Sequence, residues 1–358
     1  MFLAHDRPEE GGLQLEQGKG MLVVATRRVL LVGGAGYVGT SLTERLLAQG
    51  YEVVVLDNLL YGQGDCLSVF EGQANFRLII GDMRDQRCLD KAMKGTTDAV
   101  LLAGLVGEPI TTRYPKEADE VNNSAIRLCI DTFGRSDVER VIFISTCSNY
   151  GIVDSGQPAD ERHPLMPLSD YAKAKVDVEH YLEEQSRTAD YVHTILRFAT
   201  AFGVAPRMRF DLTVNEFTRE LALGRELKVY DPHTWRPYCH VRDFGHLIEL
   251  VLEAPVDLVK GEVFNAGGDA NNSTKQGIID LLLSIVPGAR VRLVDGSPDP
   301  RDYRVSFAKV RQSLGFEPTI SIEGGIQELI DSIAGGSFGA DHPPNGQWGN
   351  YEIADVPI

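Results

Sequence analysis

The clearest pattern of hydrophobic and polar positions lies near the start of the chain. Residues 29–32 are four consecutive apolar residues, as in a strand that is buried on both faces of a parallel sheet. Glycines follow at once, leucines then recur at helical spacing between 42 and 47, and a second apolar run covers 53–56. This order predicts a strand, a tight turn, a helix and a second strand.

The alternation of strands and helices continues to about residue 203. Further strands are predicted at 77–80, 99–102, 141–145 and 191–196, with helices that include 124–133 and 169–184. Beyond this point the pattern gives shorter pieces: helices over 212–223 and 244–253, and strands near 227–230, 263 and 291. We therefore predict an α/β protein with a Rossmann-type doubly wound parallel sheet over 27–203, which later strands could rejoin, and a smaller C-terminal α/β substrate lobe over 204–334.

The two ends of the chain lack this periodicity. Residues 1–26 are polar and predict a flexible N-terminal extension, within which Met21 could be the natural start. Residues 335–358 are rich in Gly, Pro and Asn and predict an irregular C-terminal arm.

The turn after the first strand has the spacing G-x-x-G-x-x-G, formed by Gly33, Gly36 and Gly39. A backbone without Cβ atoms can turn tightly, approach phosphates and let the following helix pack closely, and the helix N-terminus offers free N–H groups to an anion. Asp57 ends the second strand, where a carboxylate accepts hydrogen bonds from both ribose hydroxyls and repels a 2′-phosphate. These residues predict a dinucleotide site that favours NAD over NADP.

Composition excludes several other partners. The 358 residues carry a formal net charge of −16, which disfavours nucleic acid and anionic membranes as partners. The five cysteines and eight histidines show no metal-binding spacing, so no metal site is expected. No run reaches the roughly 18 apolar residues of a membrane span, and the start of the chain lacks the features of a signal peptide, so we expect a cytoplasmic protein.

Two residues in the predicted helix 169–184 are candidates for acid–base chemistry. Tyr171 and Lys175 lie four residues apart and therefore share one helix face. A neighbouring cation lowers the pKa of a phenol, so Tyr171 could act as a general base near neutral pH. Thr146 stands at the C-terminal end of an apolar strand, where open α/β sheets bind ligands.

Taken together, these motifs resemble the extended short-chain dehydrogenase/reductase family, specifically its NAD-dependent sugar-nucleotide epimerases and dehydratases. The resemblance covers about residues 27–333. Its marks are the glycine turn with Asp57, Gly81-Asp82-Met83, Ala103, the strand that leads to Tyr150-Gly151, the segment from Glu161 through Pro164 and Pro167 to Tyr171 and Lys175, Leu196-Arg197, and the segment from Arg236 through His240 to Asp243.

The resemblance implies a role for each site residue. Thr146 would bind the reacting sugar hydroxyl, Tyr171 would remove its proton, and Lys175 would hold the nicotinamide ribose and lower the tyrosine pKa. NAD would be bound by Gly33, Gly36, Tyr37, Val38, Gly39, Asp57, Asn58, Asp82, Met83, Ala103, Tyr171 and Lys175. A nucleotide-diphosphate sugar would be bound by Asn122, Thr146, Ser148, Arg236 and Arg301, and the two arginines would clamp its diphosphate. Relatives often dimerise, so the resemblance also implies a homodimer.

Departures from the family pattern favour one reaction. Dehydratases of this family carry an Asp-Glu pair directly after the threonine, whereas this chain has Cys147 and Ser148. Reductases of the family usually take NADPH, which Asp57 disfavours. We therefore predict a redox-neutral epimerase with retained NAD and a transient keto sugar. A dehydratase, reductase or dehydrogenase of the same family and a non-catalytic NAD-binding protein remain alternatives.

Four further residues are interpreted more simply. Arg207 and Arg209 could meet a sugar carboxylate or lie on the surface. His240 is expected to be a packed structural residue, and Asp243 is expected to cap the helix that follows it.

Overall fold

The computed structural model describes residues 27–153, 156–294, 296, 300–338 and 348–353. The predicted extension 1–26 therefore lies outside the described residues. Within them, no helix combines the length and the apolar character that crossing a membrane requires.

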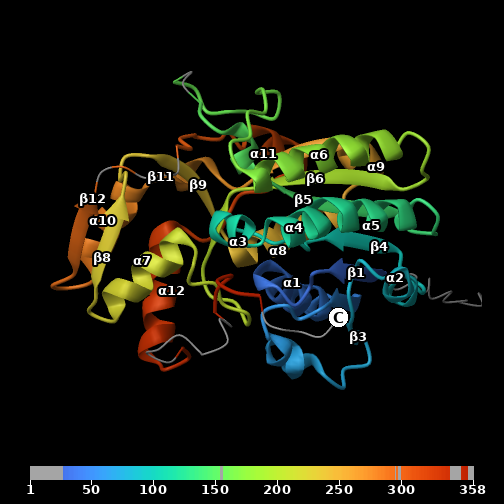
Figure 1. Cartoon of the computed structure of the whole chain (residues 1–358), viewed down its shortest axis with the longest axis horizontal. Coiled ribbons are helices and arrows are strands. Elements are labelled where there is room, and N and C mark those ends of the chain that lie inside the picture. Colours follow the sequence, from blue (N-terminus) through green and yellow to red (C-terminus); the bar gives the residue numbers. More distant parts are fainter. Residues whose placement is uncertain (1–26, 154–155, 295, 297–299, 339–347, 354–358) are drawn as a thin grey trace, which may run out of the picture.

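A seven-stranded parallel sheet forms the larger part of the molecule (Figure 1). From edge to edge its strands are β10 (Glu262–Ala266), β6 (Val192–Phe198), β5 (Arg140–Thr146), β4 (Asp98–Leu101), β1 (Arg28–Val32), β2 (Glu52–Asp57) and β3 (Phe76–Ile80). The apolar run of β1 is wholly buried from Val29 onward, because β4 and β2 flank it and helices cover both faces. The predicted doubly wound sheet is confirmed.

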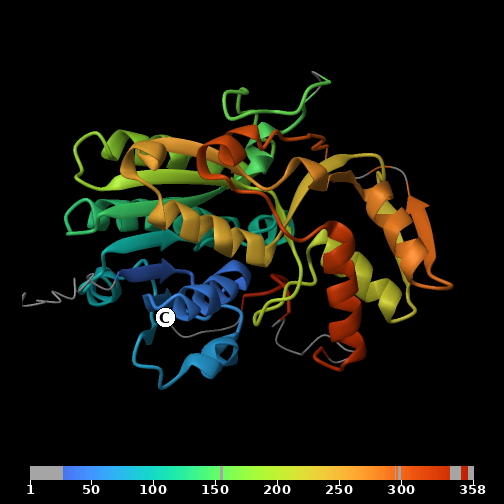
Figure 2. The same cartoon turned by 180° about the vertical axis from the view of Figure 1, so that it is seen from behind.

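Helices pack on both faces of this sheet. One face is covered by α2 (Gln86–Ala92), α5 (Ile126–Phe133) and α6 (Asp170–Gln185), whose apolar residues form one core with the sheet. The opposite face carries α1 (Tyr37–Ala48) and α8 (Val241–Glu253), which lie side by side in Figure 2. Short helices complete this unit: α3 (Glu108–Arg113), α4 (Pro115–Asp119), a π-helical turn over Glu120–Ala125, α9 (Val256–Val259) and α11 (Ala308–Leu314).

A smaller lobe with its own apolar core stands at one end of the sheet. Its helices are α7 (Thr213–Ala222), α10 (Lys275–Ile285) and α12 (Ile322–Ala334). Strands β8 (Glu226–Tyr230) and β12 (Arg290–Val294) pair in parallel, and β9 (Trp235–His240) lies between β7 (Thr200–Phe202) and β11 (Asn272–Thr274).

Two elements that follow residue 203 belong to the large sheet rather than to the lobe. β10 pairs with β6 as the edge strand, and α8 buries Phe244, Leu247 and Ile248 in the same core as α1. A single boundary at residue 203 therefore does not separate the two units, because the chain returns to the sheet after entering the lobe.

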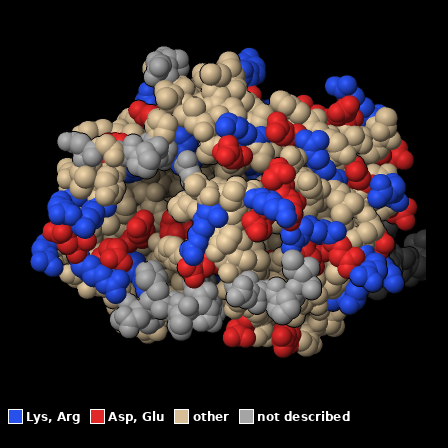
Figure 3. All heavy atoms as spheres, viewed as in Figure 1, with Lys and Arg blue, Asp and Glu red and all other residues tan. Residues whose placement is uncertain are grey.

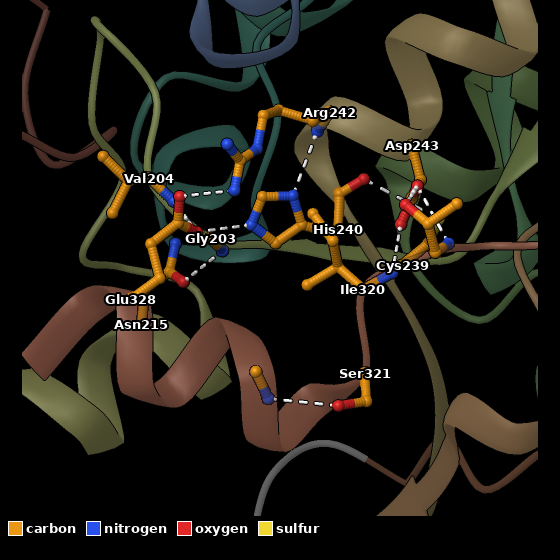
Figure 4. A network of polar contacts seen from close by, with 12 residues as sticks. Gly203, Val204, Asn215, Cys239, His240, Arg242, Asp243, Ile320, Ser321 and Glu328 are labelled. Atoms are coloured by element: carbon orange, nitrogen blue, oxygen red, sulfur yellow. Dashed lines mark hydrogen bonds and ion pairs between the residues drawn. The ribbon is translucent and has the colours of Figure 1, made fainter.

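His240 and Glu328 connect β9 to α12 (Figure 4). The His240 ring is fully buried, and its Nδ1 accepts from the Arg242 backbone N–H, so Nε2 carries the proton donated to Glu328 at 2.7 Å. His240 is thus the N-cap of α8 and a packed residue. The prediction that Asp243 caps this helix is wrong: its carboxylate accepts from the Thr319 hydroxyl and from the backbone N–H groups of Thr319 and Ile320.

Candidate functional site

A cavity of about 980 Å³ runs from the end of the parallel sheet to the lobe. Its walls come from the turn between β1 and α1, the C-terminal ends of β2, β4 and β5, the start of α6, and loops of the lobe. On the face shown in Figure 3, acidic and basic side chains are interspersed over the surface. The site residues named from the sequence can be placed relative to this cavity.

The glycine turn requires its glycines for two different reasons. Gly33 has φ +83°, and a Cβ there would lie 2.6 Å from the backbone of Ala103, so the turn is in close contact with the loop that follows β4. A Cβ on Gly39 would lie 2.5 Å from the carbonyl oxygen of Gly34, so α1 can pack on the turn only without a side chain. Gly36 precedes the first residue of α1, and no side chain caps that helix start within the described residues. The cavity is therefore lined by a bare helix N-terminus, a suitable place for an anion.

Asp57 lies at the end of β2, where both of its carboxylate oxygens are already oriented. Oδ2 accepts from the Ala35 N–H at 3.0 Å and Oδ1 from the Leu59 N–H at 2.9 Å. Burial raises the pKa of Asp57, and the two backbone N–H groups oppose that shift. Oδ1 also accepts a long hydrogen bond from the Gln63 amide at 3.4 Å, so the carboxylate, which can accept about four, has one lone pair left on Oδ2 and one on Oδ1 that only this amide occupies. This geometry suits the two hydroxyls of a ribose, so the residues present fit a dinucleotide.

The other residues expected to bind the cofactor are distributed along the same wall. Those that line the cavity are Tyr37, Val38, Asn58, Asp82, Met83 and Ala103. Asp82 forms an ion pair with Arg84 and accepts from the Asn58 amide at 3.1 Å. Burial would raise the pKa of Asp82, but the hydrogen bonds from Arg84 outweigh it and lower that pKa. Tyr37 also has a structural role, because its hydroxyl donates to the Gly203 carbonyl at 2.6 Å.

Thr146, Tyr171 and Lys175 also line this cavity. Thr146 ends β5, and its hydroxyl oxygen accepts from the Ser148 N–H at 3.1 Å, which leaves the O–H free to donate. Ser169 caps α6 through the Ala172 N–H, so Tyr171 lies in the first turn of that helix. Lys175 is 2% exposed and donates from Nζ to the Ile144 carbonyl at 2.8 Å. The end of β5 and the start of α6 thus bring the three side chains together.

The predicted effect of Lys175 on the tyrosine is not found. Burial raises the pKa of Tyr171 to about 12, and the cation that opposes this most is Arg209. Lys175 Nζ lies 5.9 Å from the centre of the Tyr171 ring, and burial lowers the pKa of the lysine to about 7. Desolvation therefore outweighs the attraction between this ammonium group and the phenol, because both groups lie deep in the protein.

The substrate end of the cavity contains both predicted arginines. Arg301 Nη1 donates to the Ser148 hydroxyl at 3.3 Å, and that hydroxyl lies 3.2 Å from the hydroxyl of Tyr303. The Arg236 guanidinium lies 5.2 Å from the centre of the Tyr303 ring and donates to the Arg301 carbonyl. Tyr303 was missed from the sequence, although an aromatic residue beside Arg301 was a signal for it.

Asn122 does not line the cavity, so its predicted contact with substrate is not supported. It is 1% exposed within the π-helical turn, and its amide group pairs with both backbone groups of Leu105, at 2.8 and 3.0 Å. Asn122 therefore holds the loop after β4 in place. Cys147 is also withdrawn from the cavity, because its thiol contacts the Arg197 carbonyl. The burial that results raises the pKa of this thiol.

Arg207 and Arg209 are buried cavity residues, so the surface interpretation is wrong. They are 1% and 7% exposed, and Asp211 binds Arg209 through both carboxylate oxygens. Met208, which lies between them, and Phe210, which follows Arg209, enter the core of the lobe. This alternation of polar and apolar residues was the available signal. Asn350 and Tyr351 from the C-terminal arm also line the cavity, which the sequence did not suggest.

Among the described residues, no cluster of His, Cys, Asp and Glu is suited to hold a metal ion. The polar groups of the cavity are thus a bare helix start, an oriented carboxylate, a threonine, a tyrosine and a lysine, with arginines at the far end.

Comparison with known proteins gives a consistent result. A model of the NAD-dependent epimerase/dehydratase family matches residues 29–267. A dTDP-glucose 4,6-dehydratase from Streptomyces niveus is 27% identical over 316 residues, which span 85% of this chain and 92% of that protein. A UDP-glucose 4-epimerase from Halalkalibacterium halodurans is 27% identical over 81% of this chain and 90% of its own length. The crystal structure of Thermus thermophilus UDP-glucose 4-epimerase in complex with NAD superposes with a TM-score of 0.76 at 25% identity, covering 86% of this chain and 99% of that one.

Proposed function

The chain belongs to the NAD-dependent epimerase/dehydratase family, and on that premise we propose that it inverts a hydroxyl-bearing carbon of a nucleotide-diphosphate sugar. One observation carries the proposal. Thr146, Tyr171 and Lys175 line the same cavity as the glycine turn and Asp57, so base and cofactor site face one space. A protein that only bound NAD would not need these three side chains beside it.

The absence of a carboxylate pair after the threonine favours epimerisation over dehydration. Cys147 points away from the cavity, and the Ser148 hydroxyl is engaged with Tyr303 and Arg301. Neither can protonate and deprotonate a leaving hydroxyl as two carboxyl groups would. The experiments described below distinguish the epimerase from a dehydratase, a reductase and a dehydrogenase.

In the proposed reaction the chain's own residues handle the proton and hold the substrate. Thr146 donates to the sugar hydroxyl, Lys175 fixes the strand end through Ile144, and Tyr171 takes the proton as its phenolate. Burial raises the pKa of Tyr171 to about 12, so its ionisation near neutral pH requires the positive charge that bound NAD would bring beside it. NAD, when bound by the glycine turn and Asp57, supplies a hydride acceptor that returns the hydride to the same carbon. Arg236 and Arg301 hold the diphosphate of the substrate as charged hydrogen-bond donors. Before the hydride returns, the keto sugar turns its other face to the coenzyme, and the same base then returns the proton, so the sugar leaves with one centre inverted.

Two experiments test the proposal. Purified protein is denatured and the supernatant is assayed for NAD, which should be released. Individual sugar nucleotides are then incubated with the protein, and NMR should show a changed ring-proton coupling without net NADH absorbance. Net NADH would indicate a dehydrogenase or reductase, and loss of water from the sugar a dehydratase. Bound NAD without turnover of any sugar nucleotide would favour the non-catalytic alternative.

We also propose a cytoplasmic homodimer that does not bind nucleic acid or membranes. The net charge of −16 supports the second part, and the family resemblance is the basis of the first. Light scattering should give twice the mass of the chain, and a monomeric mass would contradict the dimer.

A further inference from the structure

The last described segment of the chain, residues 348–353, packs against both units of the molecule. We call it the C-terminal clasp. At one end, Trp348 packs edge to face on Phe210 and Phe338, and its carbonyl accepts from the Phe210 N–H at 2.8 Å. At the other end, Ile353 packs against a buried cluster on the side of the parallel sheet, formed by Tyr61, Leu105, Ile110 and Ala118. The clasp is visible as a short red piece beside α1 in Figures 1 and 2.

The middle of the clasp forms part of the cavity wall. Asn350 and Tyr351 line the cavity, and Asn350 is only 8% exposed. Its amide donates to the Val106 carbonyl at 2.9 Å, so the clasp is attached to the loop after β4. This loop also carries Leu105, which Asn122 holds in place. The clasp therefore joins lobe and sheet beside the cofactor site.

Arg207 is attached to the clasp from inside the cavity. Its Nη2 donates to the Gly349 carbonyl at 3.1 Å and to Asn350 Oδ1 at 2.9 Å, and its guanidinium lies 4.9 Å from the centre of the Tyr61 ring. Its backbone N–H donates to the Thr40 hydroxyl, which places it over the first turns of α1. Arg207 thus lies between the clasp and the helix that follows the glycine turn.

The charge of Arg207 is poorly compensated. The guanidinium is 1% exposed, and Nε–H has no acceptor among the residues that the structure describes. Burial, and after it the neighbouring Arg209, lower its pKa to about 10. Asp211 binds Arg209 instead. A buried cation without a paired carboxylate is costly unless an anion joins it.

The position of Arg207 over the first turns of α1 indicates which anion it would bind. We propose that Arg207 donates from Nε to an oxygen of the NAD diphosphate, and that the C-terminal clasp holds Arg207 in place and so retains the coenzyme. The proposal rests on the proposed function, since it requires NAD beside the glycine turn. Arg207 and the start of α1 would then face the same anion from two sides. Asn350 is a positioning residue, because it acts through Arg207.

Retention of the coenzyme has a direct use in an epimerase. A hydride that is removed from a sugar and returned to the same sugar requires the same coenzyme molecule throughout. A clasp that slows release of NAD would therefore favour completed inversion over loss of the reduced coenzyme.

The test compares two ligands, ADP and adenosine, of which only the first carries a diphosphate. Affinities for ADP and adenosine are measured on NAD-stripped wild type, Arg207→Gln and Arg207→Lys. We expect Arg207→Gln to weaken ADP by about tenfold to a hundredfold, the scale of a charged hydrogen bond, with adenosine unchanged. Arg207→Lys should restore part of the ADP affinity because it keeps the charge. Equal ADP affinity in wild type and Arg207→Gln would overturn the assignment of Arg207.

The matched control is Arg219→Gln. Arg219 is also 1% exposed and stacks on Phe210 and Trp348, but it does not line the cavity. Its loss should leave the ratio of ADP to adenosine affinity unchanged. A shift in that ratio equal to the one in Arg207→Gln would show a general effect of damage and would overturn the proposal.

The clasp is tested separately by the release rate of NAD. Asn350→Ala removes the hydrogen bonds of this buried side chain to Arg207 and Val106, and a melting curve of the variant shows whether it is folded. We expect NAD to dissociate from this variant about ten times faster than from wild type. A chase of labelled NAD with excess unlabelled coenzyme measures the rate. An unchanged rate would refute the clasp. Wild-type protein that binds neither NAD nor ADP would instead refute the proposed function, and the inference with it.

Discussion

Single residues of this site combine tasks that are usually considered separately. Asp57 closes the turn through Ala35 and Leu59 and still offers acceptors to the cavity. Lys175 fixes the end of β5 through Ile144 while lying below Tyr171. Because each side chain is held by a backbone partner, a substitution tests chemistry and local structure together, and conservative changes are the informative ones.

The first prediction concerns the base. Tyr171→Phe removes one hydroxyl that makes no hydrogen bond within the part of the chain that the structure describes, so folding and NAD content should stay as in wild type. Turnover of the sugar nucleotide should fall by at least about 10²-fold, the usual contribution of a general base. NMR of the substrate measures turnover, and the 260 nm absorbance of the denatured supernatant measures NAD. Wild-type turnover would remove Tyr171 from the mechanism.

The second prediction concerns the choice of coenzyme. Asp57→Ala removes the acceptor of two backbone N–H groups and the negative charge that repels a 2′-phosphate. Affinity for NAD should fall and discrimination against NADP should weaken, as calorimetry with both coenzymes would record. Asp57→Asn is the control, because it keeps one acceptor and loses the charge. Unchanged affinity for NAD together with no gain for NADP would contradict the role of this carboxylate.

The third prediction concerns the dependence of stability on pH. The pKa of Lys175 is about 7 in the folded protein and near 10.5 when exposed, so between these values the unfolded chain binds the extra proton. Stability due to this group is therefore lowest below about pH 7 and rises with pH up to about 10.5. Lys175→Met removes this titrating group and with it the contribution to the pH dependence, and the variant should be inactive.

Denaturant unfolding of wild type and Lys175→Met at pH 7 and pH 9, in the absence of NAD, measures the contribution of Lys175 to the free energy of unfolding. The wild type should gain about 1–3 kcal/mol relative to Lys175→Met over that interval. Parallel changes in both proteins would mean that the ammonium is not desolvated as strongly as the buried position implies.

At the scale of elements, the glycine turn shows what strict backbone requirements contribute. Gly33 and Gly39 are needed because Ala103 and Gly34 lie where a Cβ would be, and this contact sets the distance between β1, β4 and α1. The sequence predicted the turn, the strand before it and the helix after it, because all three depend on residues close together in the chain. It did not predict that Asp243 accepts from Thr319 and Ile320, since that contact joins residues 76 positions apart.

The fourth prediction separates space from backbone strain. Gly33 and Gly50 have nearly equal φ values, +83° and +85°, but only Gly33 has atoms where a Cβ would lie. Gly50→Ala should cost about 1–2 kcal/mol of unfolding free energy through strain alone. Gly33→Ala should cost at least about 2 kcal/mol more, because the loop that follows β4 must move. Chemical denaturation measures both, and equal losses would show that the turn can relax.

At the scale of the whole molecule, the cavity is formed by segments from most of the chain. The presence of Thr146 and Tyr171 in the cavity could be predicted, since one ends a strand and the other begins a helix, and both elements have clear periodicity. Two features could not be predicted: the return of Asn350 to the cavity and the raised pKa of Tyr171. Each depends on how distant segments pack, and burial, which sets the pKa, has no local signal in the sequence.

The return of α8 and β10 to the large sheet implies an order for synthesis on the ribosome. A nascent chain that has emerged only to residue 203 exposes the β6 edge that β10 covers and the surface of α1 that α8 covers. The nucleotide-binding unit would then be completed only after residue 266 leaves the exit tunnel. An isolated 27–203 fragment should therefore aggregate, whereas adding α8 and β10 as a separate peptide should raise its soluble yield. A soluble, monomeric 27–203 fragment would show that translation need not proceed so far before this unit folds.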